Sequence, residues 1–361
     1  MNNQELIEFR RSLLAWFFQS RRDLPWRQNR DPYRIWLSEI MLQQTRVAVV
    51  VPYYERFLEK FPSVQSLAAA PEEEILRAWS GLGYYSRARN LQKAAQQILA
   101  VHGGEFPKTW EETLALPGIG AYTAAAILSI AFGEKRAVLD GNVARVLARI
   151  GAVRGDLREG KRWQALQRTA DELLDQSTPG DWNQAMMELG ATICTPRAPQ
   201  CLLCPVSNFC RSRKTGWQDR LPEKRRKRAS VEVNLVTAVF LNGQGETLLL
   251  PPPKTARKKT ADDVTTLVSG MWHFPTESAQ DDLAQTLNTL VRRHSKASAI
   301  LPEALRQVRH AVTYRKVKVF PFRIALGRLP RIPGAKKVPL GEVSAMPVSN
   351  LTRKIVRSAL A

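Results

Sequence analysis

The feature that most constrains how this chain folds is the placement of its cysteines. All four lie within 17 residues, at Cys194, Cys201, Cys204 and Cys210, with the spacing C-x6-C-x2-C-x5-C. Four sulfur atoms so close in sequence can surround one metal centre, whereas a disulfide framework is not expected in a cytoplasmic chain of this size. Zinc sites usually pair two short Cys knuckles across a longer spacer, but iron–sulfur clusters accept four cysteines in one run. The spacing favours a [4Fe–4S] cluster and leaves a Zn(Cys)4 site as the alternative.

The charge of the chain indicates a polyanionic partner. Lys and Arg outnumber Asp and Glu by 54 to 33, which gives a net charge of +21 and a pI near 10.3. Residues 217–361 hold 26 basic and 11 acidic side chains, so this part of the chain should bind phosphate as strongly as residues 1–216. Arg197, Arg211, Arg213 and Lys214 make the cysteine segment cationic, which predicts a contact with a nucleic-acid backbone.

The sequence has neither a membrane span nor a signal-peptide pattern. No stretch approaches the ~18 apolar residues that a span requires, and Met1–Ser20 has the pattern of an ordinary amphipathic helix. A basic protein of membrane surfaces is the alternative, but here the charge is spread over the chain without an amphipathic basic helix. We therefore expect a cytoplasmic, nucleoid-associated monomer without a membrane partner.

The length of 361 residues exceeds the usual limit of one hydrophobic core, so two domains are expected. Residues 1–216 have apolar positions at helical spacing between Pro and Gly breaks, which predicts an all-α domain. Residues 217–230 contain the basic run Lys224–Arg228 and lack an apolar period, as is typical of a linker. Residues 231–361 change to short β-type runs, which predicts a smaller α+β domain.

The individual elements follow from the same patterns. The expected helices of the first domain are Leu6–Phe18, Tyr33–Phe57, Pro71–Ser80, Ala88–Val101, Tyr122–Ala131, Val143–Ile150, Lys161–Leu174 and Trp182–Ala191. In the second domain, the expected strands are Val231–Leu241, Thr247–Leu250, Val308–Tyr314 and Val317–Ile324, and helices are expected near Asp281–His294 and Ser349–Leu360. Pro251–Lys259 reads as a Pro- and Lys-rich loop.

A tight turn precedes the helix of small residues Ala121–Ala131. The segment Leu116–Gly120 reads LPGIG, and its Pro and two glycines (Gly118, Gly120) let backbone N–H groups approach a phosphate closely. An ordinary connection between two helices is an equally good interpretation of this motif taken alone.

Two carboxylates are candidates for catalysis. Asp140 directly precedes the predicted helix at Val143–Ile150, where it can cap the N-terminus, and the helix dipole would hold it ionised. On a helix, Glu39 shares its face with Ile35 and Leu42, so desolvation should raise its pKa and keep it partly protonated near neutral pH. Capping alone and a surface position are the respective alternatives.

Taken together, the LPGIG hairpin, the late Asp140 and the four cysteines resemble the helix-hairpin-helix DNA glycosylases, the group that includes endonuclease III. Within that group, five segments resemble the adenine glycosylases of the MutY type. They are LPWR (Leu24–Arg27), SEIMLQQTRV (Ser38–Val47), GLGYYSRARNL (Gly81–Leu91), LDGNVARVLAR (Leu139–Arg149) and NQAMMELGATICTPR (Asn183–Arg197). The resemblance implies a helical glycosylase domain with an iron–sulfur loop at 194–210, acting in base excision repair.

The resemblance also implies a hydrolytic mechanism. Lyase-competent relatives resemble LPGxGxKT, in which a Lys forms a Schiff base with the sugar, and Tyr122 in its place cannot do so. Glu39 would protonate N7 of adenine and then assist water, and Asp140 would stabilise the oxocarbenium-like sugar. Tyr122 and Asn142 would orient Asp140, and Arg27 is carried over from LPWR as an active-site partner.

The partner that the resemblance implies is duplex DNA with adenine opposite 8-oxoguanine or guanine, from which the adenine is flipped out. Gln44 and Tyr84 resemble the residues that fill the resulting gap, with helix packing as the alternative. Leu116, Gly118 and Gly120 of the hairpin would contact phosphate.

The C-terminal part matches the family less closely. Leu267–Pro275 (LVSGMWHFP) resembles the Nudix-like mispair-recognition domain of these enzymes, here 231–361, but the acidic Nudix box does not follow it. Pyrophosphate hydrolysis is therefore not expected. The family has a loop close to Phe-Ser-His that probes 8-oxoguanine. Here Thr313 retains a hydroxyl, but Val312 and Tyr314 replace the Phe and the His.

Three other functions compete with this interpretation. A lyase of damaged pyrimidines is disfavoured by Tyr122, and a DNA-binding protein without activity is disfavoured by the presence of both Glu39 and Asp140. A nucleotide hydrolase of the Nudix type is disfavoured by the missing acidic box.

Overall fold

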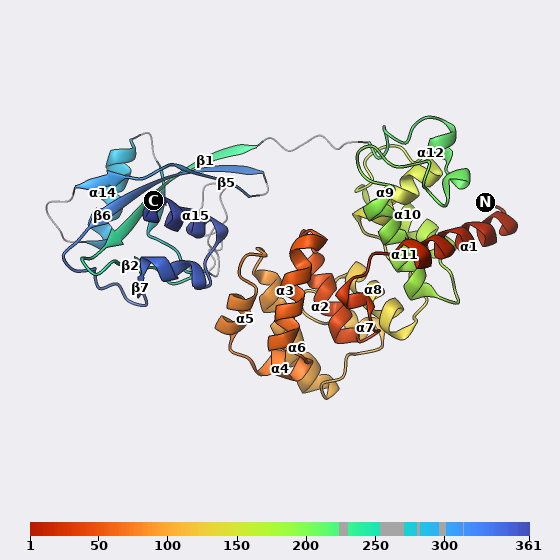
Figure 1. Ribbon diagram of the computed structural model, residues 1–361, viewed down its shortest axis with the longest axis horizontal. Helices are drawn as coiled ribbons and strands as arrows, with labels where there is room; N and C mark the ends of the chain where they lie inside the picture. The colour runs from red at the N-terminus through yellow and green to blue at the C-terminus, as the bar shows by residue number, and fades with distance from the viewer. Residues whose placement is uncertain (224–229, 253–270, 280–281, 296–300, 313) are drawn as a thin grey trace. The chain divides into compact units, whose positions relative to one another are not determined.

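The computed structural model describes residues 1–223, 230–252, 271–279, 282–295, 301–312 and 314–361. Contacts between Cα atoms divide the chain into two compact units, whose elements are labelled in Figure 1. The first unit is Met1–Ala70 together with Ser86–Arg226, and the second is Pro71–Tyr85 together with Lys227–Ala361. A segment from within the predicted helical domain thus packs with the C-terminal part of the chain.

The first unit is helical in its described residues, which confirms the predicted class. Its helices are α1 (Asn3–Ser20), η1 (Pro25–Arg27), α2 (Pro32–Leu42), α3 (Val47–Lys60), α4 (Val64–Ala69), α6 (Ser86–His102), α7 (Trp110–Leu114), α8 (Ala121–Phe132), α9 (Gly141–Gly151), α10 (Gly160–Leu173), α11 (Pro179–Thr192), η2 (Ser207–Phe209) and α12 (Arg211–Lys214). The short helices α4, α7 and α12 were not predicted, because four to six residues show too little periodicity.

The predicted helix Tyr33–Phe57 is wrong as one element, because α2 ends at Leu42 and α3 begins at Val47. The break is stabilised by a residue that lies far away in the sequence. Arg87 of α6 donates hydrogen bonds to the carbonyl oxygens of Ile40, Met41 and Gln43 at 2.8, 2.9 and 2.6 Å. These carbonyls lie at the end of a helix, where backbone partners run out, and the apolar spacing of the sequence does not show it.

Helix α11 lies at the centre of the first unit, where it packs against α1, α8 and α9, while α2 packs against α8. Trp182 of α11 is buried, and its ring packs at a tilt against that of Phe9 of α1, with 5.8 Å between ring centroids. This packing brings the N-terminus of α9, the middle of α2 and one face of α11 to a common cavity.

The first residues of the predicted linker, Trp217–Glu223, are packed rather than free. The carbonyl oxygen of Leu221, which is 1% exposed, accepts a 2.8 Å hydrogen bond from Arg149 of α9. The guanidinium of Arg154 lies 4.6 Å from the centroid of the Trp217 ring. The two apolar anchors Trp217 and Leu221 explain the difference, since the linker was inferred from basic composition. Residues 224–229 lie outside the described part of the chain.

The second unit is built around a mixed sheet, which confirms the predicted α+β class. The described strands are β1 (Val231–Leu241), β2 (Glu246–Leu249), β3 (Thr276–Ser278), β4 (Pro302–Ala304), β5 (Val308–Val312), β6 (Arg315–Ala325) and β7 (Lys336–Pro339), and the helices are α5 (Glu72–Ala78), α14 (Leu283–His294), η3 (Leu340–Ala345) and α15 (Asn350–Leu360). The strand order is β4-β6-β1-β2-β7, with β3 paired to β1 and β5 paired to β6. Strand β1 runs parallel to β6 from Val231↔Arg315 to Leu241↔Ala325.

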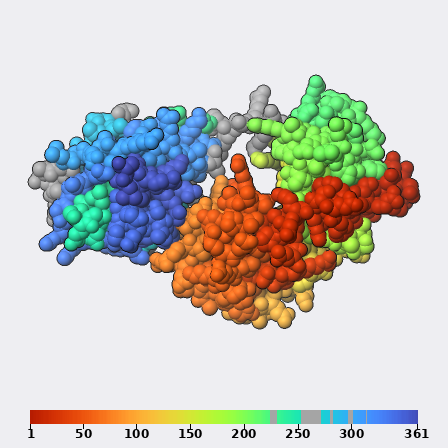
Figure 2. Space-filling view, in the orientation of Figure 1, coloured from red at the N-terminus to blue at the C-terminus, as the bar shows by residue number. Residues whose placement is uncertain are grey.

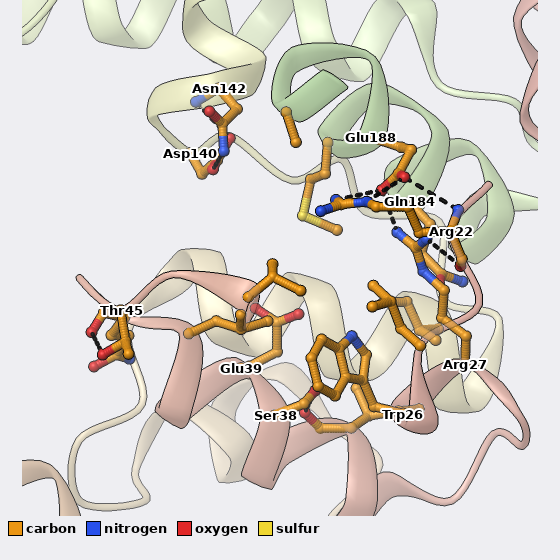
Figure 3. A pocket seen from close by; sticks show the side chains of 18 of the residues that line it. Arg22, Trp26, Arg27, Ser38, Glu39, Thr45, Asp140, Asn142, Gln184 and Glu188 are labelled. Carbon is orange, nitrogen blue, oxygen red and sulfur yellow. Dashed lines mark hydrogen bonds and ion pairs between the residues drawn. The ribbon is translucent and has the colours of Figure 1, made fainter. Parts of the chain in front are cut away.

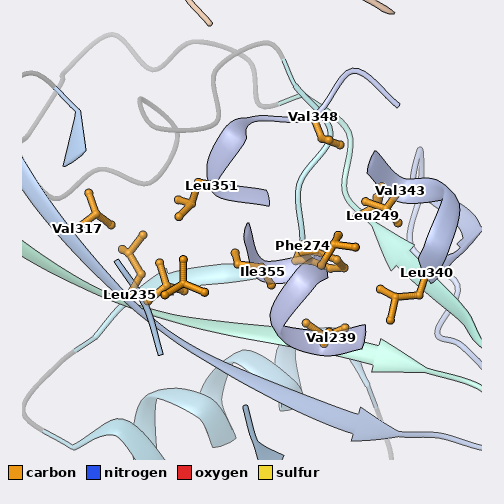
Figure 4. Close-up of a cluster of buried hydrophobic side chains, with 14 of the residues drawn as sticks. Leu235, Val239, Leu249, Phe274, Val317, Leu340, Val343, Val348, Leu351 and Ile355 are labelled. Atoms are coloured by element: carbon orange, nitrogen blue, oxygen red, sulfur yellow. The ribbon is translucent and has the colours of Figure 1, made fainter. Parts of the chain in front are cut away.

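Strand β1 is buried on both faces, as its nearly continuous apolar run requires. Leu235 and Val239 pack with Ile355 of α15 in one cluster, which Figure 4 shows around Phe274. Val236 and Phe240 face the other way and pack with Leu287 and Leu290 of α14. The two helices therefore cover opposite faces of the sheet.

In the described ranges, no helix is long and apolar enough to cross a membrane.

Candidate active site

A cavity of about 340 Å³ lies in the first unit between η1, α2, α8, α9 and α11. Figure 3 shows Glu39 on one side of this cavity and Asp140 with Asn142 on the opposite side. Glu188 and two arginines form a third group at the edge. The two carboxylates singled out in the sequence are thus brought to one cavity.

Glu39 is buried among the apolar side chains of α2 and the surrounding helices. Burial raises the pKa of Glu39 from 4.5 to about 7, and the charge of Asp140 raises it further, while a hydrogen bond from Tyr122 and the charge of Arg27 oppose the shift. The predicted effect of desolvation on this residue is confirmed. At neutral pH the carboxyl is divided between its protonated and ionised forms.

Tyr122 contacts Glu39, whereas the sequence predicted a contact with Asp140. Its Oη donates a 2.7 Å hydrogen bond to Oε2 of Glu39, and Sδ of Met187 lies 3.2 Å from the same Oη. The prediction that Tyr122 orients Asp140 by hydrogen bonding is therefore corrected, because the packing of α8 on α2 turns the ring toward Glu39. Burial and the two nearby carboxylates raise the pKa of Tyr122, so the phenol remains a donor.

Asp140 is the N-cap of α9, as predicted. Its Oδ1 accepts hydrogen bonds from the backbone N–H groups of Asn142 and Val143 at 2.9 and 2.7 Å, and its Oδ2 accepts one from Nδ2 of Asn142 at 2.9 Å. Burial raises the pKa of Asp140, while these hydrogen bonds and the charge of Arg145 lower it. Because all three partners are N–H donors, the geometry favours the ionised carboxylate.

Asn142 connects Asp140 to the cysteine segment. Its Oδ1 accepts a 2.9 Å hydrogen bond from Nη2 of Arg145, whose Nε donates to the carbonyl oxygen of Cys194 at 2.8 Å. Gly190 of α11 passes close by, since a Cβ at this position would lie 2.7 Å from Cβ of Asn142. The sequence did not single out Arg145 or Gly190, because their importance depends on the crossing of α9 and α11.

A buried acid that the sequence did not single out lies at the edge of the cavity. Glu188 of α11 is 1% exposed and forms ion pairs with Arg22 at 2.7 Å and with Arg27 at 2.8 Å. Hydrogen bonds and charge from both arginines overcome the effect of burial and lower the pKa of Glu188 to about 2. Arg27 does line the cavity, as expected, but its ion pair is with Glu188.

The LPGIG turn precedes α8 and has mixed exposure. Gly118 has φ +81°, and a Cβ there would lie 2.8 Å from Cβ of Asn90, so only glycine fits without displacement. Gly118 and Gly120 are exposed, whereas the side chain of Leu116 is buried. The side chain of Leu116 therefore packs inside the first unit, and the contact of this residue with DNA stays a prediction.

The two residues expected to fill the gap in DNA share an unusual backbone conformation. Gln44 has φ +58° and Tyr84 has φ +50°, in the left-handed region that side chains other than glycine rarely adopt. Both side chains are exposed, which does not favour the alternative interpretation that they only pack between helices. Gln44 borders the cavity of the first unit, and Tyr84 belongs to the second unit.

The four cysteines line a separate small cavity of about 30 Å³, next to Arg149. Nη1 of Arg149 lies 3.3 Å from Sγ of Cys194. Burial raises the pKa of Cys204 to about 12, and the neighbouring thiols add to the shift. In the residues that the structure describes, no three His, Cys, Asp or Glu side chains form a group that could hold a metal ion. The segment lies at the molecular surface, where it is green in Figure 2.

The C-terminal candidates are only partly described. Val312 ends β5, and the carbonyl oxygen of Tyr314 accepts a hydrogen bond from the N–H of Val231. Thr313 and residues 267–270 lie outside the described ranges. Burial and the charge of Lys354 lower the pKa of His310.

The chain is similar in sequence to known proteins. Residues 37–173 match the family model of the HhH-GPD superfamily base excision DNA repair protein. A Homo sapiens protein, "Adenine DNA glycosylase", is 36% identical over 407 residues, covering 98% of this chain and 74% of the human one. A Schizosaccharomyces pombe protein of the same name is 40% identical over 228 residues, covering 58% of this chain and 50% of the other.

The solved structure of a thermostable thymine-DNA glycosylase has a TM-score of 0.54 at 33% identity, covering 59% of this chain and 98% of that one.

Proposed function

The chain belongs to the adenine DNA glycosylases, monofunctional enzymes of base excision repair that hydrolyse the N-glycosidic bond of adenine, and we propose that the cavity between Glu39 and Asp140 is its active site. The observation that carries this proposal is the contrast between the surroundings of the two carboxyls. Glu39 has a pKa near 7 and is a proton donor, while Asp140 accepts three N–H groups as a carboxylate. Glycoside hydrolysis requires two carboxyl groups whose surroundings give them different pKa values, so that one donates a proton and the other stays ionised.

Glu39 is the general acid. Adenine is a poor leaving group as an anion, and a proton on N7 lets it depart as a neutral base. Because Tyr122 donates to Oε2 of Glu39, the proton of the carboxyl is carried on Oε1, which is left for the base. Once ionised, Glu39 accepts a proton from the attacking water.

Asp140 stabilises the positive charge that develops on the sugar, electrostatically or through a transient covalent bond. Asn142 holds the carboxylate in place by two of its three hydrogen bonds. Tyr122 supplies no amine for a Schiff base, so the DNA strand stays intact until the abasic product is treated separately.

Contacts with DNA come from exposed groups on both units. Gln44 and Tyr84 fill the gap left by the extruded adenine, and the exposed glycines Gly118 and Gly120 offer backbone N–H groups to phosphate. The basic second unit, proposed to be a Nudix-like mispair-recognition domain, reads guanine or 8-oxoguanine opposite the adenine, with Thr313 as a contact. The partner is then mispaired duplex DNA, bound by a monomer in the cytoplasm at the nucleoid.

The four cysteines would hold a [4Fe–4S] cluster. They line one cavity, and thiolates are the ligands that such a cluster takes. Four cysteines in one run are a ligand set that an iron–sulfur cluster accepts, whereas zinc sites usually pair two short knuckles. When bound, the cluster supplies structural cross-linking of residues 194–210, and Arg145 and Arg149 tie that segment to α9.

The test uses duplexes with adenine opposite 8-oxoguanine, guanine or thymine, each product being split with and without hot alkali. Strand breaks only after alkali, and only in the first two duplexes, are expected, and Glu39→Gln should abolish them. Breaks without alkali would indicate a lyase. If adenine is not released from any of the duplexes, the proposal is refuted. An absorbance band near 400 nm with bound iron is expected, whereas a colourless protein with one zinc would refute the cluster.

A further inference from the structure

The loop between α5 and α6 has a backbone that its sequence alone would not adopt. Gly81 and Gly83 have φ +111° and +73°, and Tyr84 follows them at +50° with its side chain 47% exposed. Glycine adopts such angles freely, but a tyrosine does so only where surrounding contacts impose the conformation. The contacts that hold this loop therefore decide where the ring of Tyr84 is presented.

The residue next to Tyr84 makes those contacts. Tyr85 is buried, and its Oη donates a 3.0 Å hydrogen bond to the carbonyl oxygen of Val348. The hydroxyl of Ser80 lies 3.1 Å from the same Oη, and since the tyrosine proton is used on Val348, Ser80 is the donor. Arg353 of α15 in turn donates to Oγ of Ser80. A directed chain of hydrogen bonds thus runs from Arg353 through Ser80 and Tyr85 to Val348.

The far end of this chain is part of the core of the second unit. Val348 is fully buried in the apolar cluster beneath α15, and Trp272 pairs with it through a backbone bridge. Ser349, the next residue, caps α15 by accepting from the N–H of Thr352 at 3.0 Å. The carbonyl oxygen that receives Tyr85 is consequently fixed by the fold of the sheet unit.

The residue before Tyr84 is also held by a hydrogen bond. Nε1 of Trp79, a buried residue, donates to the carbonyl oxygen of Gly83 at 3.2 Å, directly before Tyr84. Tyr84, between the two anchored residues Gly83 and Tyr85, exposes its side chain to solvent. The loop is therefore held on both sides of its one exposed ring.

We propose that the turn before α15 positions Tyr84 for DNA, acting through the hydroxyl of Tyr85. On this inference the C-terminal unit has a second role besides contact with the mispair, because it sets the conformation of the aromatic residue that enters the base stack. Tyr85, Ser80 and Arg353 are positioning residues that act through Tyr84. The inference rests on the proposed role of Tyr84 as a DNA contact.

A double-mutant cycle in the full-length protein tests this coupling. Tyr84→Ala, Tyr85→Phe and the double variant are compared for their Kd toward a duplex with 2′-fluoro-2′-deoxyadenosine opposite 8-oxoguanine, in which fluorine slows cleavage. Loss of one buried hydrogen bond predicts that Tyr85→Phe weakens binding by about three- to tenfold. Because the two residues act in series, the double variant should bind no more weakly than Tyr84→Ala.

A matched control separates positioning from general loss of stability. Tyr33→Phe also removes a buried tyrosine hydroxyl that donates to a backbone carbonyl, that of Phe61 at 2.7 Å, but in the first unit. It should lower the Tm to a similar extent without changing the Kd. Arg353→Met is a second variant, which loosens Ser80 and is expected to weaken binding in the same direction as Tyr85→Phe.

Three results would overturn the inference, and they distinguish a failure of the coupling from a failure of the DNA contact. If Tyr84→Ala weakens binding but Tyr85→Phe does not, or if the two effects multiply in the double variant, Tyr84 keeps its proposed role and the coupling is wrong. If Tyr84→Ala leaves the Kd unchanged, the proposed DNA contact itself is wrong, and the inference fails with it.

Discussion

The protonation of Glu39 links activity to stability. Burial raises its pKa from 4.5 to about 7, so between these values the folded chain binds a proton that the unfolded chain has released. The free energy of unfolding then falls as the pH rises through this window, by about 3 kcal/mol in total. The general acid is thus stabilising only while it carries its proton.

Glu39→Gln is expected to abolish excision and to stabilise the fold at alkaline pH. The neutral amide can still accept the hydrogen bond of Tyr122, so the free energy of unfolding should rise by about 2–3 kcal/mol at pH 8 and change little at pH 4.5. Urea denaturation at both pH values measures this. Equal stabilities of the two proteins at pH 8 would contradict the assigned pKa.

Glu188→Gln is expected to lower the stability of the fold and to shift the pH profile of the excision rate. Two arginines would lose a buried anion, which costs about 2–3 kcal/mol after allowance for the partial exposure of Arg22. Since the charge of Arg27 already lowers the pKa of Glu39, loss of the opposing charge should lower it further. The decline of the single-turnover rate with rising pH should then begin at a lower pH than in the wild type.

The ion pair of Asp181 with Arg30 provides a control for that variant. It joins an acid of the same helix to an arginine at 3.2 Å, but the Arg30 side chain is 68% exposed. Asp181→Asn should cost less than about 1 kcal/mol and leave the pH profile in place. An unchanged pH profile in Glu188→Gln would mean that Glu188 is a structural residue only.

Among the helices, the crossing of α9 and α11 decides the geometry around Asp140. Gly190→Ala would bring a Cβ to 2.7 Å from Cβ of Asn142 and displace the N-terminus of α9. Overpacking of this kind costs about 1–3 kcal/mol, and a displaced Asn142 should lower the rate of excision. Thermal unfolding and single-turnover kinetics measure the two effects.

Gly160→Ala is the matched control for this crossing. Gly160 begins α10, has no positive φ, and a Cβ there would meet no atom within 4 Å. The variant should therefore match the wild type in stability and rate. If Gly190→Ala were equally neutral, the close packing of α11 on Asn142 would not matter for catalysis.

For the chain as a whole, the net charge of +21 should make binding to duplex DNA strongly dependent on salt. If six or more phosphates are contacted, the affinity should fall by about a thousandfold between 50 and 200 mM salt. Fluorescence anisotropy with paired and mispaired duplexes should give similar slopes, while the excision rate at saturating protein stays constant. A change below about tenfold would mean that few phosphates are contacted.

Prediction from sequence succeeded where the relevant neighbours are close along the chain. Desolvation of Glu39 follows from Ile35 and Leu42 on the same helical face, and the cap by Asp140 involves residues two and three positions away. Glu188 could have been found by the same reasoning, because it lies between Met187 and Leu189 in an apolar stretch. Its two arginine partners could not, since they lie more than 160 positions earlier.

What the sequence by itself determined was local: helical and β-type periodicity, the cap of α9, the clustered cysteines and the excess of positive charge. Only the tertiary structure decided that Tyr122 binds Glu39, that Arg87 ends α2, and that Pro71–Tyr85 packs with the sheet unit. The physical reason is that side-chain spacing along a helix or strand is set by backbone geometry. The partner of a buried polar group is set by which distant segments the whole core brings into contact.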